Sequence, residues 1–208
     1  MKFKNPLCLL GITLFIQLLF FSVADADFME PFTIKSEGIE LRVEQVADNF
    51  SVPWSMAFIS KEKMLITERD GSVYLFNLTD AKKRKLSNTP SVLATGQGGM
   101  LDVILSPDFP KTGWIYFTYV KAIDGKGATT LGRGRLNDEQ SGFSEWQELL
   151  VTKSTSGTSR HFGSRIAFDD KGHLFFGIGD RGERDYAQDL SNHAGAILRL
   201  NLDGSVPD

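Results

Sequence analysis

The chain has 208 residues, of which 41% are hydrophobic and 24% charged, and its formal net charge is −3. This composition is typical of a folded chain and excludes wholesale disorder, while the acidic balance argues against nucleic-acid binding, which normally needs a basic domain or stripe. The single cysteine excludes a disulfide scaffold and a cysteine-ligated metal site.

Residues 1–26 are predicted to form a cleavable signal peptide. Two lysines precede an almost unbroken apolar run over 7–23, and Ala24-Asp25-Ala26 then gives the small-x-small pattern of a signal peptidase site. The apolar run is near the lower limit for a spanning helix, so an uncleaved anchor is the alternative. The polar Gln17 and the adjacent alanine pair favour cleavage. We therefore expect an exported protein, periplasmic or secreted, that begins at Asp27 and has no membrane segment once the leader is removed.

Three successive segments share one layout of short apolar strands separated by turns. Turn sequences such as Asp70-Gly71 interrupt the apolar runs, and only 185–190 could form a short turn of helix. The predicted strands cover 54–59, 64–68 and 73–76, then 101–105, 114–120 and 130–136, then 165–168, 173–178 and 196–200. The pattern predicts an all-β fold of antiparallel sheets.

Units of this size and composition favour a β-propeller, in which each sheet buries its faces against its neighbours. The chain supplies about three such blades, and the third lacks its outermost strand. A closed ring needs about four blades or more. We therefore expect residues 27–208 to be the N-terminal half of a truncated propeller, and an open stack of three sheets is the alternative.

Polar residues that could take part in catalysis or binding gather in three loops next to predicted strands, at 96–102, 159–165 and 177–185. None of the loops matches a phosphate loop, a serine-nucleophile elbow or a zinc-protease helix. His161 is the best candidate for a general base, because imidazole titrates nearest neutrality. The Asp180 loop leaves the second strand of the same hairpin, so Asp180 is expected to share a rim with His161 and to orient its ring. The alternatives are a solvated histidine, a turn-stabilising Gln97 and a solvated charge run over 181–185.

Long motifs in series carry a family resemblance that covers nearly all of the chain after residue 40. The motifs are PWSMAF and MLITERDG, then GQGGMLDV, then RHFGSRIAFDDKGHLF, then GIGDRGERDYAQDL and LRLNLDGSVPD. The chain resembles the pyrroloquinoline-quinone-dependent sugar dehydrogenases of the glucose/sorbosone dehydrogenase type. It is closer to the aldose sugar dehydrogenase branch than to the soluble glucose dehydrogenase branch. The resemblance implies a six-bladed propeller with the quinone near its axis.

The resemblance also implies roles for four residues. His161 corresponds to the base that takes the proton of the sugar C1 hydroxyl while hydride passes to the quinone, and Asp180 to the aspartate that orients it. Gln97 corresponds to a glutamine that contacts the cofactor. Asp185 stands where the glucose branch has a cofactor-contacting glutamine. The implied partners are an aldose sugar, which is oxidised to its lactone, and an external electron acceptor.

By resemblance, the remaining blades would carry the basic side chains that hold the quinone and the ligands that bind calcium. We therefore expect no metal ligand within this chain. Two other functions stay open at this point. One is a non-catalytic propeller module that binds a partner through its rim. The other is a calcium-dependent sugar-lactone hydrolase, which would need acidic or amide ligands that converge on the axis.

Overall fold

The computed structural model describes residues 29–208, so the predicted leader at 1–26 lies outside the described residues. The described chain divides into two units, one that ends at Gln45 and one that spans Val46–Asp208. Within residues 29–208, no helix is long and apolar enough to cross a membrane.

The first unit contains an antiparallel hairpin of β1 (Phe32–Ser36) and β2 (Ile39–Val43). Glu37 and Gly38 join the strands, and both have positive φ angles of 48° and 82°, which is the backbone of a tight hairpin turn. The side chains alternate, so that Phe32 and Ile34 share a face with their partners Val43 and Leu41. The sequence analysis did not predict these two strands.

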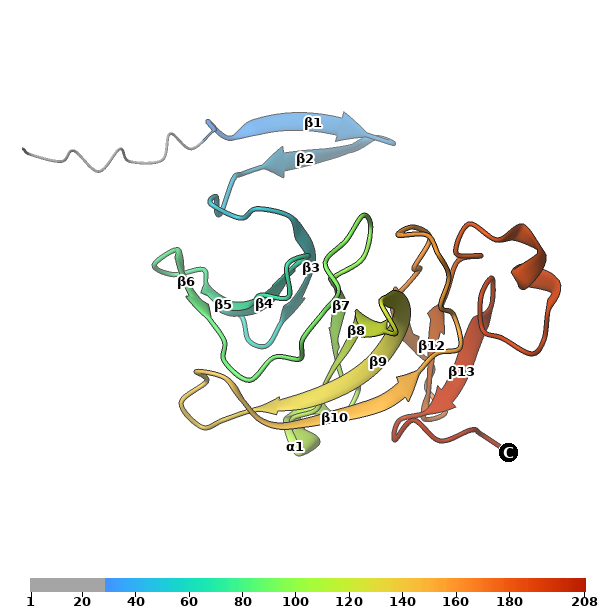
Figure 1. Ribbon diagram of the computed structural model, residues 1–208. Helices are drawn as coiled ribbons and strands as arrows, with labels where there is room; N and C mark the ends of the chain where they lie inside the picture. Colours follow the sequence, from blue (N-terminus) through green and yellow to red (C-terminus); the bar gives the residue numbers. More distant parts are fainter. Residues whose placement is uncertain (1–28) are drawn as a thin grey trace, which may run out of the picture. The chain divides into compact units, whose positions relative to one another are not determined.

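The second unit consists of three antiparallel sheets in chain order, and each strand pairs with the next one in the sequence (Figure 1). Sheet 1 contains β3 (Pro53–Phe58), β4 (Lys63–Glu68), β5 (Val73–Asn77) and β6 (Lys82–Lys85). Sheet 2 contains β7 (Met100–Leu105), β8 (Ile115–Ile123), β9 (Lys126–Leu136) and β10 (Phe143–Val151). Sheet 3 contains β11 (Ile166–Phe168), β12 (His173–Gly177) and β13 (Ile197–Asn201).

The three predicted repeat units correspond to these three sheets, and sheet 3 has no fourth strand among the described residues. The outer strands β6 and β10 were missed. Two short helices complete the unit. The first, α1 (Phe109–Thr112), was not predicted, whereas the 3-10 helix η1 (Arg184–Gln188) lies where a helical turn was expected.

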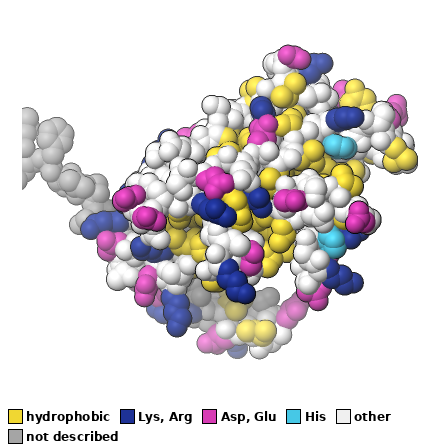
Figure 2. Space-filling model, turned by 90° about the horizontal axis from the view of Figure 1, so that it is seen from below, with side chains coloured by type: hydrophobic (Ala, Val, Ile, Leu, Met, Phe, Trp, Pro, Cys, Tyr) yellow, Lys and Arg dark blue, Asp and Glu magenta, His cyan; other side chains and the backbone are white. Residues whose placement is uncertain are grey.

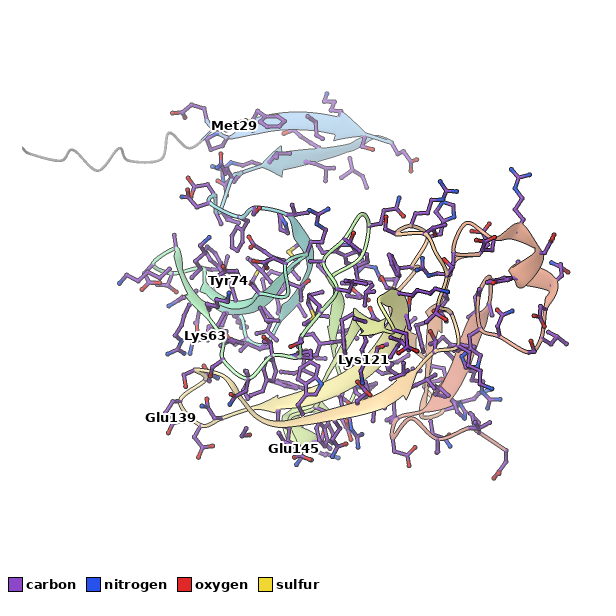
Figure 3. All side chains as sticks on the ribbon, viewed as in Figure 1. Met29, Lys63, Tyr74, Lys121, Glu139 and Glu145 are labelled. Carbon is purple, nitrogen blue, oxygen red and sulfur yellow. The ribbon has the colours of Figure 1, made fainter. Side chains whose placement is uncertain are left out.

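Sheet 2 is buried on both faces, because successive side chains of β8 belong to two different cores. Ile115 and Phe117 pack with side chains of sheet 1, whereas Tyr116, together with Trp114 directly before the strand, packs with side chains of sheet 3. Burial on both faces explains why the first six residues of β8 are apolar except for the buried Thr118. Charged side chains such as Lys63, Lys121 and Glu145 lie on the surfaces and edges of the sheets (Figure 3).

The antiparallel pairing places loops at two rims of this unit. β7 and β11 begin, and β8 and β12 end, at one rim, where Met100 pairs with Tyr119 and Ile166 with Phe176. We call this the His161 rim, since the loop with His161 directly precedes β11. The opposite rim carries α1, the turn between β11 and β12, and the end of β13.

Candidate active site

The three polar loops predicted from the sequence meet at the His161 rim. The N–H of Gln97 donates to the carbonyl of Ser159 over 2.9 Å, and the N–H of Ser164 donates to the carbonyl of Gly177 over 2.8 Å. A Cβ atom at Gly179 would lie 2.5 Å from the carbonyl oxygen of His161, so only glycine permits this approach of the two loops. The glycines of these loops therefore bring the polar side chains together.

His161 and Asp180 form the central pair of the site. Nδ1 of His161 lies 2.6 Å from Oδ1 of Asp180, and the N–H of Gly182 donates to the same oxygen over 2.9 Å. The hydrogen bond from His161 and that from Gly182 hold the pKa of Asp180 below its ordinary value. An ionised carboxylate only accepts hydrogen bonds, so the ring proton belongs on Nδ1 and the lone pair on Nε2 is free. The side chain of His161 is 48% exposed, so the ring is open to solvent.

Gln97 fixes the backbone at His161. Its Oε1 accepts the N–H of His161 over 2.8 Å, at a residue that holds the left-handed φ angle of 57°. Because Oε1 is the accepting atom of this contact, the other end of the carboxamide is the amide nitrogen, which is a donor. The exposed amide nitrogen of Gln97 has no hydrogen-bond partner among the described residues, and it can donate to a ligand.

Asp185 is not part of this cluster. It lies exposed on η1, and the structure gives it no hydrogen bond or ion pair with Gln97, His161 or Asp180. Its predicted contact with a cofactor stays a prediction.

The alternative of a solvated charge run over 181–185 does not hold for Arg181, whose side chain is completely buried. Its Nη2 donates to the carbonyls of Gly127 and Thr158, both over 3.1 Å, and Nε donates to Ser154. The guanidinium also lies 3.6 Å from the ring centre of Phe162, and burial lowers its pKa to about 10. Arg181 therefore holds the loop after Asp180 in place, while Glu183, Arg184 and Asp185 are exposed as expected.

The sequence analysis also missed the role of Asp102, a carboxylate that is 1% exposed where the first strands of the three sheets meet. It accepts hydrogen bonds from Ser55 of β3 over 2.7 Å and from the backbone N–H of Ile166 of β11 over 2.7 Å. Arg165, which is 71% exposed, donates to it over 2.6 Å and lies 5.6 Å from the ring centre of Trp54. A single acidic residue inside the apolar strand 100–105 is the signal that could have identified this buried link.

No cluster of three or more His, Cys, Asp or Glu side chains that could hold a metal ion occurs within residues 29–208.

The comparison with protein families identifies the family to which the chain with this site belongs. The Glucose / Sorbosone dehydrogenase family matches residues 50–208, which include the loops of Gln97, His161 and Asp180. The chain belongs to this family. Among curated relatives, the aldose sugar dehydrogenase YliI of Escherichia coli is 38% identical to this chain over 170 residues. The match covers 81% of this chain and 46% of that relative, so the chain spans about half of its length.

Solved structures of the family have the same arrangement of sheets. The soluble aldose sugar dehydrogenase of Escherichia coli in its apo form matches with a TM-score of 0.76 over 79% of this chain and 48% of its own. The PQQ-bound aldose sugar dehydrogenase of Streptomyces coelicolor matches with a TM-score of 0.69 at 24% identity, over 78% of this chain and 48% of its own. The predicted fold class, an all-β β-propeller, is thereby confirmed, and this chain covers about half of each of these structures.

Proposed function

We propose that this chain carries the acid–base half of a quinone-dependent aldose dehydrogenase that oxidises the C1 hydroxyl of an aldose to the lactone. The observation that carries the proposal is the 2.6 Å contact between Nδ1 of His161 and Asp180, with the His161 backbone held by Gln97. The family match and the aldose dehydrogenase names of the relatives support it.

In the proposed reaction, each residue has a distinct part. The free Nε2 of His161 accepts the proton of the C1 hydroxyl. The ionised Asp180 keeps the ring in the productive tautomer and stabilises the imidazolium that forms. Bound pyrroloquinoline quinone would supply the acceptor for the hydride from C1, and an external acceptor would then remove the two electrons. Loss of one proton and one hydride converts the hemiacetal carbon into the lactone carbonyl.

The residues of the His161 rim fit an anionic quinone in two respects. The amide nitrogen of Gln97 is an exposed donor, and the guanidinium of Arg165 is an exposed cation anchored by Asp102. Both are suited to the carbonyl and carboxylate oxygens of the cofactor. Asp185 would bring a negative charge toward the same cofactor, so its contact needs its own test. We route no step through calcium, since the described residues offer no ligand cluster.

We also propose that the protein acts outside the cytoplasm, in the periplasm or as a secreted protein. The leader at 1–26, with its signal peptidase pattern at Ala24-Asp25-Ala26, supports this location.

Replacing His161 by Ala in the complete gene product is expected to lower kcat about 10²–10⁴-fold, which is the usual contribution of a positioned base. The Asp180→Asn variant should show a smaller loss in the same direction, because it disturbs the ring without removing it. The measurement is stopped-flow reduction of the quinone at saturating sugar.

The matched control is His193→Ala. His193 accepts the backbone N–H of Lys153 through Nδ1 and has no contact with Asp180, so this variant should keep the parent rate. Quinone reduction by His161→Ala at the parent rate would show that the base assignment is wrong.

A further inference from the structure

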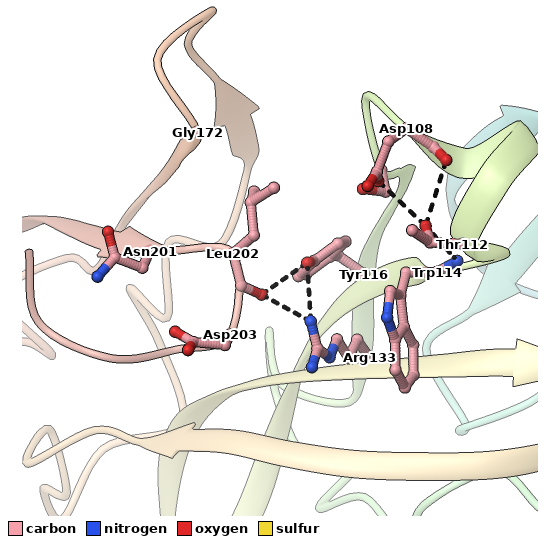
Figure 4. Close-up of a pocket in the computed structure, with 10 residues that line it drawn as sticks. Asp108, Thr112, Trp114, Tyr116, Arg133, Gly172, Asn201, Leu202 and Asp203 are labelled. Atoms are coloured by element: carbon pink, nitrogen blue, oxygen red, sulfur yellow. Dashed lines mark hydrogen bonds between the residues drawn. The ribbon is translucent and has the colours of Figure 1, made fainter.

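A polar cavity lies at the rim opposite the proposed catalytic site, between sheets 2 and 3 (Figure 4). Its volume is about 390 Å³, which lies within the range of about 300–1,000 Å³ typical of small-molecule sites. The loop around α1, the strands β8 and β9, and the turn after β13 all contribute to its walls. The three side chains of the proposed catalytic site are not among its lining residues.

The inner wall of this cavity is fixed by buried aromatic side chains and one arginine. Trp114 is 8% exposed and Tyr116 is completely buried. The hydroxyl of Tyr116 donates to the carbonyl of Leu202 over 2.6 Å, and Nη1 of Arg133 donates to the same carbonyl over 3.0 Å. The guanidinium of Arg133 also lies 4.1 Å from the ring centre of Trp114. Figure 4 shows this hydrogen-bonded corner next to Asp203 and Asn201.

Two carboxylates on opposite walls are each held through one oxygen only. Oδ1 of Asp108 accepts the hydroxyls of Ser106 and Thr112, and Oδ1 of Asp203 accepts the N–H and the hydroxyl of Ser205. These hydrogen bonds lower the pKa of both carboxyl groups, so both are ionised at neutral pH. Their Oδ2 atoms have no hydrogen-bond partner among the described residues, and the same is true of Nη2 of Arg133 and Oδ1 of Asn201.

The open groups on the lining residues are therefore three acceptors and one donor, and the side chains of these residues carry two negative charges and one positive charge. Such a site repels an anion such as a phosphate. A sugar fits it, because each hydroxyl of a sugar can donate to a carboxylate or carboxamide oxygen while it accepts from a guanidinium. The rim that faces the viewer in Figure 2 likewise mixes acidic and basic side chains, without a field of one sign. We propose that this cavity is an accessory binding site for a neutral saccharide, separate from the site of oxidation.

The test uses trehalose, a non-reducing disaccharide that has no free C1 hydroxyl and so cannot be a substrate of the proposed reaction. The complete gene product is labelled with 5-fluorotryptophan, and the ¹⁹F resonance of Trp114 is assigned with Trp114→Phe. We expect trehalose to shift this resonance in a saturable way. The Asp203→Ala variant should weaken binding about tenfold, which matches the loss of one hydrogen bond to a charged group.

The matched control is Glu62→Ala, which removes one exposed negative charge from the turn between β3 and β4 and should leave the affinity unchanged. Asp108→Asn provides a second variant at the opposite wall, and it should also weaken binding. A shift that fails to saturate, an affinity unchanged by both cavity variants, or a response to inorganic phosphate in place of trehalose would each overturn the proposal. None of these outcomes depends on the activity of His161.

Discussion

At the scale of single residues, the sequence indicated where charged groups could meet but not how deeply they are buried. Asp180 and His161 flank two neighbouring strands of one hairpin, so antiparallel pairing alone predicts that they share a rim. Arg181 directly follows Asp180 in a run of charges, and no local pattern distinguishes it from the exposed Arg184. Its burial depends on carbonyls that come from residues as distant as Gly127, and contacts of this range become visible only in the structure.

Asp169 provides a prediction about pH at this scale. Burial raises the pKa of its carboxyl, but hydrogen bonds from the backbone N–H and the ring of His173 and from the backbone N–H of Lys171 outweigh this effect and hold it at about 2. Because the folded pKa is below the ordinary value of 3.8, the carboxylate stabilises the fold above that value and loses this effect as the pH falls toward 2. Asp169→Asn should therefore lower the melting temperature near neutral pH, and its difference from the parent should shrink in acid.

Thermal melts followed by circular dichroism across this pH range would measure the difference. Asp170→Asn is the control, since Asp170 is the exposed neighbour on the same turn. A difference between parent and Asp169→Asn that stays constant down to a pH of about 2 would contradict the assigned cause.

At the scale of elements, the hydrophobic pattern predicted inner strands such as β8 but missed the outer strands β6 and β10, although Phe143 and Trp146 of β10 pack against the core between sheets 1 and 2. The strand β8 reads as an apolar run because both of its faces are buried. By contrast, β6 is Lys82-Lys83-Arg84-Lys85, and all four side chains are exposed. An outer strand of this kind is held by backbone hydrogen bonds to β5, and its lysines discourage pairing with another sheet edge. Because β6 contains no apolar residue, its hydrophobic pattern could not predict a strand.

The loop after β12 provides a prediction at this scale. Arg181→Met keeps the length of the side chain but removes the donors to the carbonyls of Ser154, Thr158, Arg160 and Gly127. Each buried carbonyl left unsatisfied costs about 1–3 kcal/mol, so we expect a loss of at least about 2 kcal/mol in unfolding free energy. For a chain of this size, that loss corresponds to a fall of roughly 4–8 °C in Tm.

Differential scanning calorimetry would measure this fall. Arg184→Met changes an exposed residue of the same loop, and it should stay within about 0.5 kcal/mol of the parent. Equal melting temperatures for the two variants would show that the hydrogen bonds from Arg181 to these carbonyls do not stabilise the fold.

At the scale of the whole second unit, one buried carboxylate links the three sheets. Asp102 of β7 bonds Ser55 of β3 and Ile166 of β11, and these bonds join strands that lie far apart in the sequence. The repeat pattern predicted three sheets and their order, since each repeat encodes its own hairpins. The hydrogen bonds of Asp102 between the sheets could not be predicted from the sequence, because they depend on how the three repeats align around this one residue.

Asp102→Asn tests this link. The carboxamide keeps the shape of the side chain but places an N–H₂ group against a donor, which leaves at least one buried group unsatisfied at a cost of about 1–3 kcal/mol. Urea unfolding should show a lower midpoint with an unchanged slope, since the area exposed on unfolding stays the same.

Asp138→Asn, at an exposed turn after β9, is the matched control and should leave the midpoint in place. The interaction with Arg165 should contribute little to the loss, because that arginine is largely exposed. An unchanged midpoint in Asp102→Asn would show that the sheets hold together without this contact.

The burial of sheet 2 on both faces has a consequence for how this unit loses its structure. Since Phe117 belongs to one core and Tyr116 to the other, β8 cannot open without disrupting both cores at once. The two interfaces therefore melt cooperatively, and the amides of β8 exchange with solvent only when the whole unit unfolds. The His161 loop shares in this cooperativity, because Phe162 packs against Val120 of β8 and Leu101 of β7.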